Sequence, residues 1–267
     1  MGELKKRVIA GVCLAPVIAF LFYILPPMWL FILLMCVCVL AVHEAASLAS
    51  LTLGFLYASL VVAGGIVLLL STIENYILWI MASVVIVIFL KMLDHRASME
   101  KANRDLLAQI AVLLFSNFFI VLPFFFLYRL KERGALFPLI ILVSIWASDT
   151  LAYFIGKKFG KHPLAPHISP KKTMEGLFGS ILGSLLIIAM THNVLGITLG
   201  SALIIGAGMG ILGQAGDLME SACKRAFKIK DSSALIPGHG GILDRIDSFI
   251  FTAPFLYSCL ALDIIVR

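Results

Sequence analysis

Charged side chains are scarce in this sequence. Asp, Glu, Lys and Arg make up only 13% of its 267 residues, whereas 61% are hydrophobic, compared with roughly 45–50% in soluble domains. A water-soluble globular protein and a disordered chain are therefore excluded. The five cysteines show no CxxC spacing and no clustered framework, which excludes a disulfide-stapled secreted module.

Several familiar ligand-binding motifs are also missing. There is no GxxxxGK[ST] phosphate loop, and His43-Glu44 lies in HEAAS, which lacks the second histidine of a zinc-binding HExxH helix. A structural or interfacial role is therefore favoured for Glu44. The GxGxxG of Gly208, Gly210 and Gly213 lies inside an apolar run with no preceding strand, which favours helix packing over dinucleotide binding. No basic stripe interleaved with aromatic residues is present, so nucleic acid is not an expected partner.

Long apolar runs dominate what is there. They are continuously apolar instead of alternating, which excludes a β-barrel and predicts an all-α, polytopic integral membrane protein with about nine transmembrane helices. The runs cover residues 8–25, 28–42, 51–70, 77–93, 106–128, 135–155, 177–190, 194–213 and 249–266.

The distribution of Lys and Arg predicts the orientation in the membrane. With the N-terminus inside, most cations fall in cytoplasmic loops, and the opposite loops are nearly uncharged. Arg129, Lys131 and Arg133 disagree, because they would lie outside. The cytoplasmic loops would then contain residues 91–104, 157–172 and 224–245.

The two halves of the chain differ in character. We expect an N-terminal transmembrane region over residues 1–130 and a catalytic transmembrane region over 131–267, because the later half places Asp149 inside an apolar run and gathers charges into two loops. Glycines four residues apart predict close helix packing. These glycine pairs are Gly179 with Gly183, Gly196 with Gly200, and Gly206 with Gly210.

The first polar segment follows the run that contains Asp149. A carboxylate in hydrocarbon costs at least ~2.5 kcal/mol, so Asp149 should face protein, water or a cation. Ser169 and Pro170 are typical of a helix start, which would place Lys171 and Lys172 in the first turn. Cations there are unfavourable unless an anion binds, which favours a phosphate site. The alternative is contact of the two lysines with anionic lipid headgroups.

The second polar segment extends from residue 214 to 247. If the 194–213 helix continues outward, Asp217, Glu220, Ser221 and Lys224, with Lys228, lie along one face. A turn over 237–241 and a helix starting near residue 242 would follow, and would carry Asp244 and Asp247. Acids and bases balance in this segment, as in a Mg²⁺–polyphosphate site, although a salt-bridge network is the alternative.

The spacing Ser-x-x-Lys-Arg, four residues, Lys-Asp, then His-Gly-Gly-x-x-Asp-Arg-x-Asp over 221–247 closely resembles the motif of the phosphatidate cytidylyltransferase family, bacterial type. The SPKKT-x-EG stretch at 169–176 and the span containing Asp149 are also similar to that family. The resemblance covers about half of the chain.

The resemblance implies a Mg²⁺-dependent nucleotidyltransferase that converts CTP and phosphatidic acid into CDP-diacylglycerol and pyrophosphate in phospholipid biosynthesis. Its implied metal ligands are Asp217 and Asp244, supported by Asp149 and Asp247. Its other implied catalytic residues are Lys224 and Arg225. The implied substrate-binding residues are Ser169, Lys171, Lys172, Thr173, Ser221, His239, Gly240, Gly241 and Arg245.

Other functions stay open at this point. A CTP-dependent lipid kinase would share the metal and phosphate chemistry, and an ion-coupled transporter could use Asp149, although no inverted repeat is visible. The acidic motif of CDP-alcohol phosphotransferases is absent. The expected location is the cytoplasmic (inner) membrane, with the polar loops on the cytoplasmic side; a homodimer is left open.

Overall fold

The structure is a computed structural model that describes residues 3–49, 51, 54–93, 99–226 and 241–261. These residues form helices and one small β-hairpin. The elements are α1 (Glu3–Ile24), α2 (Pro27–Leu48), α3 (Gly54–Leu70), α4 (Ile73–Met92), α5 (Met99–Ser116), the π-helix η1 (Asn117–Val121), α6 (Leu122–Arg133), α7 (Leu136–Phe159), β1 (Pro163–Ala165), β2 (Ser169–Thr173), α8 (Met174–Met190), α9 (His192–Leu195), α10 (Leu199–Ala226), α11 (Leu243–Ile246) and α12 (Phe249–Ala261).

The helices coincide with the predicted apolar runs, so the helical fold class is confirmed. Five described segments are long and apolar enough to cross a membrane, and the protein is an integral membrane protein. Shorter apolar helices occur at 14–24, 55–70 and 174–190, and the count of nine transmembrane helices stays a prediction. The five long segments are Pro27–Leu48, Ile73–Met92, Asp105–Arg133, Leu136–Phe159 and Leu199–Ala226.

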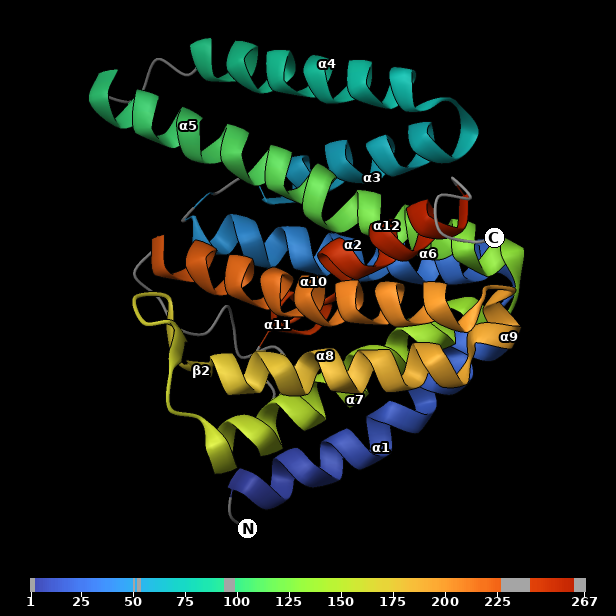
Figure 1. Ribbon diagram of the computed structural model, residues 1–267. Helices are drawn as coiled ribbons and strands as arrows, with labels where there is room; N and C mark the ends of the chain where they lie inside the picture. The colour runs from blue at the N-terminus through green and yellow to red at the C-terminus, as the bar shows by residue number, and fades with distance from the viewer. Residues whose placement is uncertain (1–2, 50, 52–53, 94–98, 227–240, 262–267) are drawn as a thin grey trace.

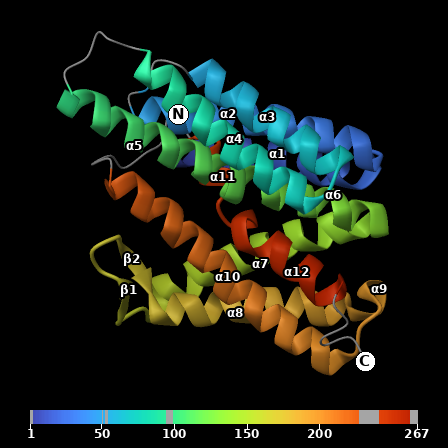
Figure 2. The ribbon, with the colours of Figure 1, turned by 90° about the horizontal axis from the view of Figure 1, so that it is seen from above.

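The helices lie side by side in stacked rows (Figure 1). Helices α3, α4 and α5 form one side of the molecule, and α1, α7 and α8 form the other. Helices α2, α6, α10 and α12 lie between them. The view from above places the β-hairpin beside one end of α8 (Figure 2). The hairpin pairs its strands antiparallel, with Pro163 opposite Thr173 and Ala165 opposite Ser169.

Glycines set the close packing of α7, α8 and α10. A Cβ atom added at Gly183 would lie 2.5 Å from the carbonyl oxygen of Ala147 on α7, and one added at Gly210 would lie 2.5 Å from the Cα of Ile181 on α8. No larger side chain fits at these distances, so the backbones of the three helices touch. Two of the three predicted glycine pairs are thereby confirmed, namely Gly179 with Gly183 and Gly206 with Gly210.

The third pair does not pack helices. Gly196 ends α9 in the left-handed backbone conformation, with a φ of 68°, and no atom lies within 4 Å of the position its Cβ would take. Its role is to terminate a helix, which glycine does without steric cost. The GxxxG spacing was misleading here because the chain turns between Gly196 and Gly200.

Buried serines tie the same three helices together. The hydroxyl of Ser148 on α7 lies 2.5 Å from that of Ser180 on α8. Ser180 and Ser184 donate to the carbonyl oxygens of Gly210 and Gly206 on α10, at 2.9 and 2.7 Å. Such bonds hold helices together where apolar contacts give no preference between protein and lipid. They fix α7 and α10 against α8, so the polar ends of these helices have a defined relative position.

The cations that disagreed with the predicted orientation have a structural role. Buried Lys131 donates to the carbonyl oxygens of Phe22 and Tyr23, at 2.6 and 2.7 Å, in the last turn of α1. Arg133 donates to the carbonyl oxygen of Leu260, at 2.8 Å, in the last turn of α12. The last carbonyl groups of a helix have no partner inside it, and these cations supply one. Charge counting over this loop therefore says little about orientation, which stays a prediction.

Candidate active site

The site forms where the C-terminal end of α10 meets α11 and the start of α12. Helix α10 continues to Ala226, as predicted, so Asp217, Glu220, Ser221 and Lys224 share one face of a continuous helix. Helix α11 begins at Leu243, close to the predicted start at residue 242. The two ends of the second polar segment, on α10 and α11, are therefore neighbours in space.

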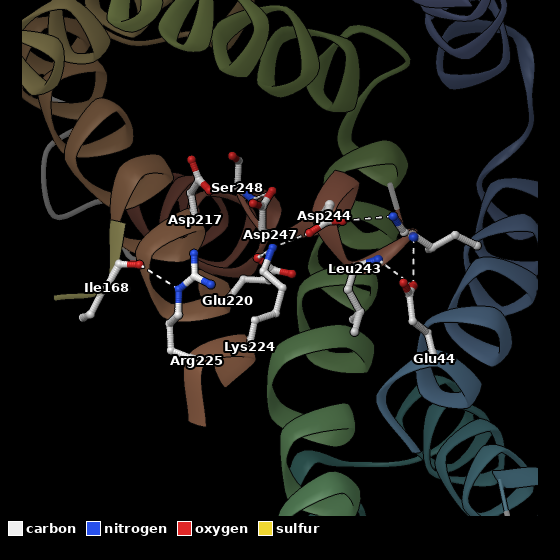
Figure 3. Close-up of polar contacts among 12 residues, drawn as sticks. Glu44, Ile168, Asp217, Glu220, Lys224, Arg225, Leu243, Asp244, Asp247 and Ser248 are labelled. Carbon is white, nitrogen blue, oxygen red and sulfur yellow. Dashed lines mark hydrogen bonds and ion pairs between the residues drawn. The ribbon is translucent and has the colours of Figure 1, made fainter. Parts of the chain in front are cut away.

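Lys224 is the centre of one charged cluster (Figure 3). Its ammonium group lies 2.5 Å from a carboxylate oxygen of Glu220, one helical turn earlier, and 2.5 Å from one of Asp244 on α11. The other oxygen of Asp244 accepts the N–H of Gly241 at 2.9 Å. The exposed fractions of the three side chains are 13%, 4% and 17%, so the cluster is largely shielded from solvent. Charges at such positions act strongly on one another.

Asp217 and Asp247 form a second pair of acids. The two carboxyl groups lie within hydrogen-bonding reach of each other, and Asp247 is buried. Gly216 makes this approach possible, because a Cβ at that position would overlap the carbonyl oxygen of Asp247. Lys172 of the β-hairpin neutralises one of the two acids, with its ammonium group 2.5 Å from a carboxylate oxygen of Asp217.

The two carboxyl groups that follow α10 differ in their titration. Burial and the negative charge of Asp217 raise the pKa of Asp247 well above its usual range. Burial also acts against ionisation of Asp244, but hydrogen bonds with Lys224, Glu220 and the Gly241 N–H outweigh it and lower the pKa of Asp244. Burial and Asp217 thus disfavour the ionised form of Asp247, whereas the contacts of Asp244 favour its ionised form.

Asp149 on α7 completes the acidic side of the site. Its side chain is exposed, although it lies in an apolar helix, and Asp217, Lys172 and Arg245 are close enough for their charges to act on it. It faces charged protein groups, as the cost of an isolated carboxylate in hydrocarbon requires. Asp149 of α7 and Asp217 of α10 thus approach each other from two different helices.

The hairpin corrects one prediction about the lysines. Ser169 and Pro170 do not start a helix; they belong to β2, and Lys171 and Lys172 lie in the same strand. Helix α8 starts after Thr173, whose hydroxyl oxygen accepts the N–H of Gly176 at 3.1 Å. Thr173 is the cap residue in the structure, and Glu175 follows it in the first turn of α8, as the helix dipole favours.

The same contacts change the roles of individual hairpin residues. The Thr173 hydroxyl accepts a bond in the helix cap, and its part in substrate binding stays a prediction. Lys172 reaches Asp217, whereas Lys171 points outward and is exposed. Phosphate binding at a helix N-terminus therefore has no basis at these lysines. Their contribution to a phosphate site would be side-chain charge alone.

Glu175 holds the hairpin in place. One of its carboxylate oxygens lies 2.7 Å from the Nδ1 atom of His162, and the other accepts the N–H groups of Lys161 and His162 at 3.0 and 3.3 Å. Arg225 on α10 donates to the carbonyl oxygen of Ile168 at 3.3 Å. The hairpin is thus fixed at its base by α8 and at its tip by α10.

The remaining predicted residues have less defined places. Ser221 lies half-buried on α10, and Arg245 is exposed on α11. Gly241 contributes its N–H to Asp244. His239 and Gly240 lie outside the residues that the structure describes, as does Lys228.

Sequence reasoning did not assign two carboxylates that the structure brings to the site. Glu220 was placed on the polar face but given no role, although its spacing of four residues from Lys224 is typical of a helical ion pair. Glu44 was favoured as structural, yet its side chain contacts α11 directly, with bonds to the N–H groups of Ile242 and Leu243 (Figure 3). Its burial in an apolar helix was the available signal.

Comparison with known proteins assigns the sequence of this chain to a family. The sequence profile of the Cytidylyltransferase family matches residues 5–263, nearly the whole chain. The chain belongs to the cytidylyltransferase family. The match includes every element that contributes to the site, and also the N-terminal helices, for which the resemblance noted from the sequence was only general.

Individual relatives are similar to this chain over part of their length. A phosphatidate cytidylyltransferase of Bacillus subtilis is 46% identical over 136 residues, which are 50% of this chain and 51% of the relative. Those of Staphylococcus saprophyticus and Staphylococcus aureus are 42% identical over 156 and 160 residues, each 58% of this chain and 60% of the relative. The chain thus spans between half and about three fifths of the curated relatives it matches.

The carboxylates of the site suit a magnesium ion whose remaining ligands are water and substrate phosphates. Among the described residues no three His, Cys, Asp or Glu side chains converge as a ready-made metal cage. Proteins bind Mg²⁺ through one or two carboxylates, leaving the other positions to water and substrate phosphates. Asp217 and Asp247 provide such a pair, because acids in mutual contact need a proton or a cation between them.

Proposed function

We propose that this protein is a phosphatidate cytidylyltransferase, which transfers the cytidylyl group of CTP to phosphatidic acid and releases pyrophosphate. The observation that carries the proposal is the meeting of the pair Asp217–Asp247 with Lys172 and of the cluster Glu220–Lys224–Asp244, at the end of an apolar helix. Paired acids and lysines beside a membrane span suit a reaction between a polyphosphate and a lipid phosphate. The names of the relatives support the same reaction.

The proposed reaction needs charge neutralisation more than acid–base chemistry. A phosphate monoester is already largely ionised at neutral pH, so an oxygen of the lipid phosphate can attack the α-phosphorus of CTP without a strong base. The bond from that phosphorus to the β-phosphate oxygen breaks, and pyrophosphate leaves with the negative charge. Lys172 and Lys224 would exchange their carboxylate partners for phosphate oxygens as the substrates enter.

A magnesium ion would be held by Asp217 and Asp247, with Asp244 and Asp149 nearby, and when bound it would supply positive charge beside the phosphates. Without substrates, Asp217 and Asp244 already hold the side chains of Lys172 and Lys224 in place, because each acid forms an ion pair with its lysine. Arg225 and Arg245 would add further positive charge at the outer edge of the site.

We also infer that the site opens to the cytoplasm, where CTP is found, and that the N-terminus lies on the same side of the cytoplasmic membrane. Lys172 contacts Asp217, and Arg225 contacts Ile168, so the loop after α7 and the end of α10 are on one side. The even number of spans between them, α8 and α10, agrees with that arrangement. The excess of Lys and Arg in these loops supports the cytoplasmic side.

The activity test uses the purified protein in detergent with Mg²⁺, CTP labelled at either the α- or the γ-phosphate, and either phosphatidic acid or diacylglycerol as the lipid acceptor. We expect the α-label to enter the lipid and the γ-label to leave as pyrophosphate. Transfer of the γ-label to lipid, with release of CDP, would identify a CTP-dependent lipid kinase instead. Absence of any CTP-dependent lipid product would refute both enzymes and favour a transporter.

Single variants connect the activity to the site. Asp217→Asn and Asp244→Asn should each remove nearly all turnover while the protein still extracts as a folded species. The matched control is Glu74→Gln, because Glu74 is an exposed acid in the first turn of α4, away from the site. Wild-type turnover of Asp217→Asn at saturating Mg²⁺ would contradict its proposed role as a metal ligand, and wild-type turnover of Asp244→Asn would contradict its proposed role in the site.

A further inference from the structure

Glu44 is a buried carboxylate that the proposed reaction does not use. It lies near the end of α2, about 200 positions before the segment it contacts, and its side chain is only 1% exposed. A buried carboxylate is costly unless donors surround it. One of its oxygens, Oε1, has no hydrogen-bond partner among the described residues, so the donors act on the other oxygen.

Those donors belong to the first residues of α11. Oε2 of Glu44 accepts the N–H of Ile242 at 2.8 Å and the N–H of Leu243 at 3.1 Å. The first N–H groups of a helix have no partner inside it, and Ile242 itself has no side-chain oxygen to serve as a cap. Glu44 therefore supplies, from a distant helix, the cap that α11 lacks in its own sequence.

The residue that follows this cap is Asp244. Its two carboxylate oxygens are directed to Lys224 and to the N–H of Gly241. The backbone of 242 and 243 determines where these oxygens point, since it immediately precedes Asp244. A shift of that backbone by a fraction of an ångström would move the carboxylate relative to Lys224.

We propose that Glu44 is a positioning residue for Asp244: it fixes the N-terminus of α11 and thereby the geometry of the carboxylate at the site. The activity measurements that test this inference rest on the proposed function. The hydrogen-exchange measurement does not depend on it. It gives the N-terminal helices a defined part in the active site, because α2 anchors the segment that carries the acid.

The test compares Glu44→Ala with Glu44→Gln in the full-length protein. The alanine removes the acceptor, whereas glutamine keeps the side-chain length and one carbonyl oxygen for the two N–H groups. The matched control is His43→Ala, since His43 is the exposed neighbour on the same helix. Amide hydrogen exchange of the segment 241–246 is measured without substrates, together with the Mg²⁺ and CTP dependence of turnover.

We expect Glu44→Ala to speed exchange in 241–246 by about tenfold or more, and to leave the middle of α10 unchanged. The Mg²⁺ concentration for half-maximal turnover should rise by about tenfold, and the KM for CTP by less. Glu44→Gln should stay within about threefold of the wild type in both measurements, and His43→Ala should match the wild type.

Three results would overturn the proposal. They are unchanged exchange in 241–246, exchange that rises equally in all helices, and a glutamine variant as impaired as the alanine variant. If the wild-type protein makes no CDP-diacylglycerol, the proposed function fails, and the exchange experiment still decides whether Glu44 holds α11. Should Glu44→Ala not fold, Glu44→Asp serves instead, because its shorter side chain withdraws the oxygen and the same outcomes apply.

Discussion

Lys224 allows the sharpest test of how the site is held together. It is the cation shared by Glu220 and Asp244, at 2.5 Å from each, and all three side chains are largely shielded from solvent. Lys224→Met keeps most of the side-chain volume but leaves two acids in contact. Removing one partner of a buried ion pair costs about 3–5 kcal/mol. Because Asp244 is 17% exposed, solvent reduces that cost, and we expect about 3 kcal/mol.

The double variant separates this charge effect from the loss of packing. Glu220→Gln in the Lys224→Met background removes the excess negative charge, so the double variant should recover about 2 kcal/mol of the lost stability. Turnover should stay low, since the proposed phosphate-binding cation is still missing. Unfolding in detergent, followed by circular dichroism, measures the four members of the cycle at one pH. Lys158→Met is the control for removal of a surface lysine, because Lys158 is exposed at the end of α7.

Additive destabilisation in this cycle would refute the reasoning. Glu220→Gln changes the free energy of unfolding of the wild type by some amount. If it changes that of Lys224→Met by the same amount, the two side chains are not coupled. The cluster would then contribute its contacts independently. The control variant should lie within about 0.5 kcal/mol of the wild type.

Three further predictions follow from the packing and the hairpin. Gly183→Leu should force α7 and α8 apart and lower both the midpoint of thermal unfolding and the turnover. An unchanged unfolding midpoint would contradict the close approach of the two helices. Lys172→Ala should raise the apparent KM for CTP by about tenfold or more and Lys171→Ala by less, and equal effects would argue against the ion pair as the relevant difference. In a cysteine-free background in inside-out vesicles, a cysteine at Ser169 should react with a membrane-impermeant thiol reagent and one at Asn193 should not; labelling of both would break the two-span arrangement.

Local patterns in the sequence were sufficient for the helices and for the polar face of α10. Continuous apolar runs have one stable form in a membrane, since a helix satisfies its backbone groups within the segment. The spacing of Asp217, Glu220 and Lys224 places them on one face of α10, because backbone geometry fixes the period of a helix. The start of α11 could also be predicted, since a glycine-rich turn precedes it.

Local patterns failed where two local solutions compete. Ser169-Pro170 is suitable both for a helix start and for a strand, because the fixed backbone angle of proline is compatible with either. Pairing of β2 with β1 and the contact of Lys172 with Asp217 select the second. The pair Gly196 and Gly200 failed similarly, because the spacing of two glycines does not say whether the chain between them is helical.

The sequence by itself therefore determined the membrane helices, the helical faces and, through its motif, the family. Only the tertiary structure decided which charges meet: Asp217 with Asp247, Lys224 with both Glu220 and Asp244, and Glu44 with the start of α11. The periodicity of a helix fixes which of its side chains share a face. Which faces touch depends on the packing of glycines and serines between helices that are far apart along the chain. No local pattern contains that information.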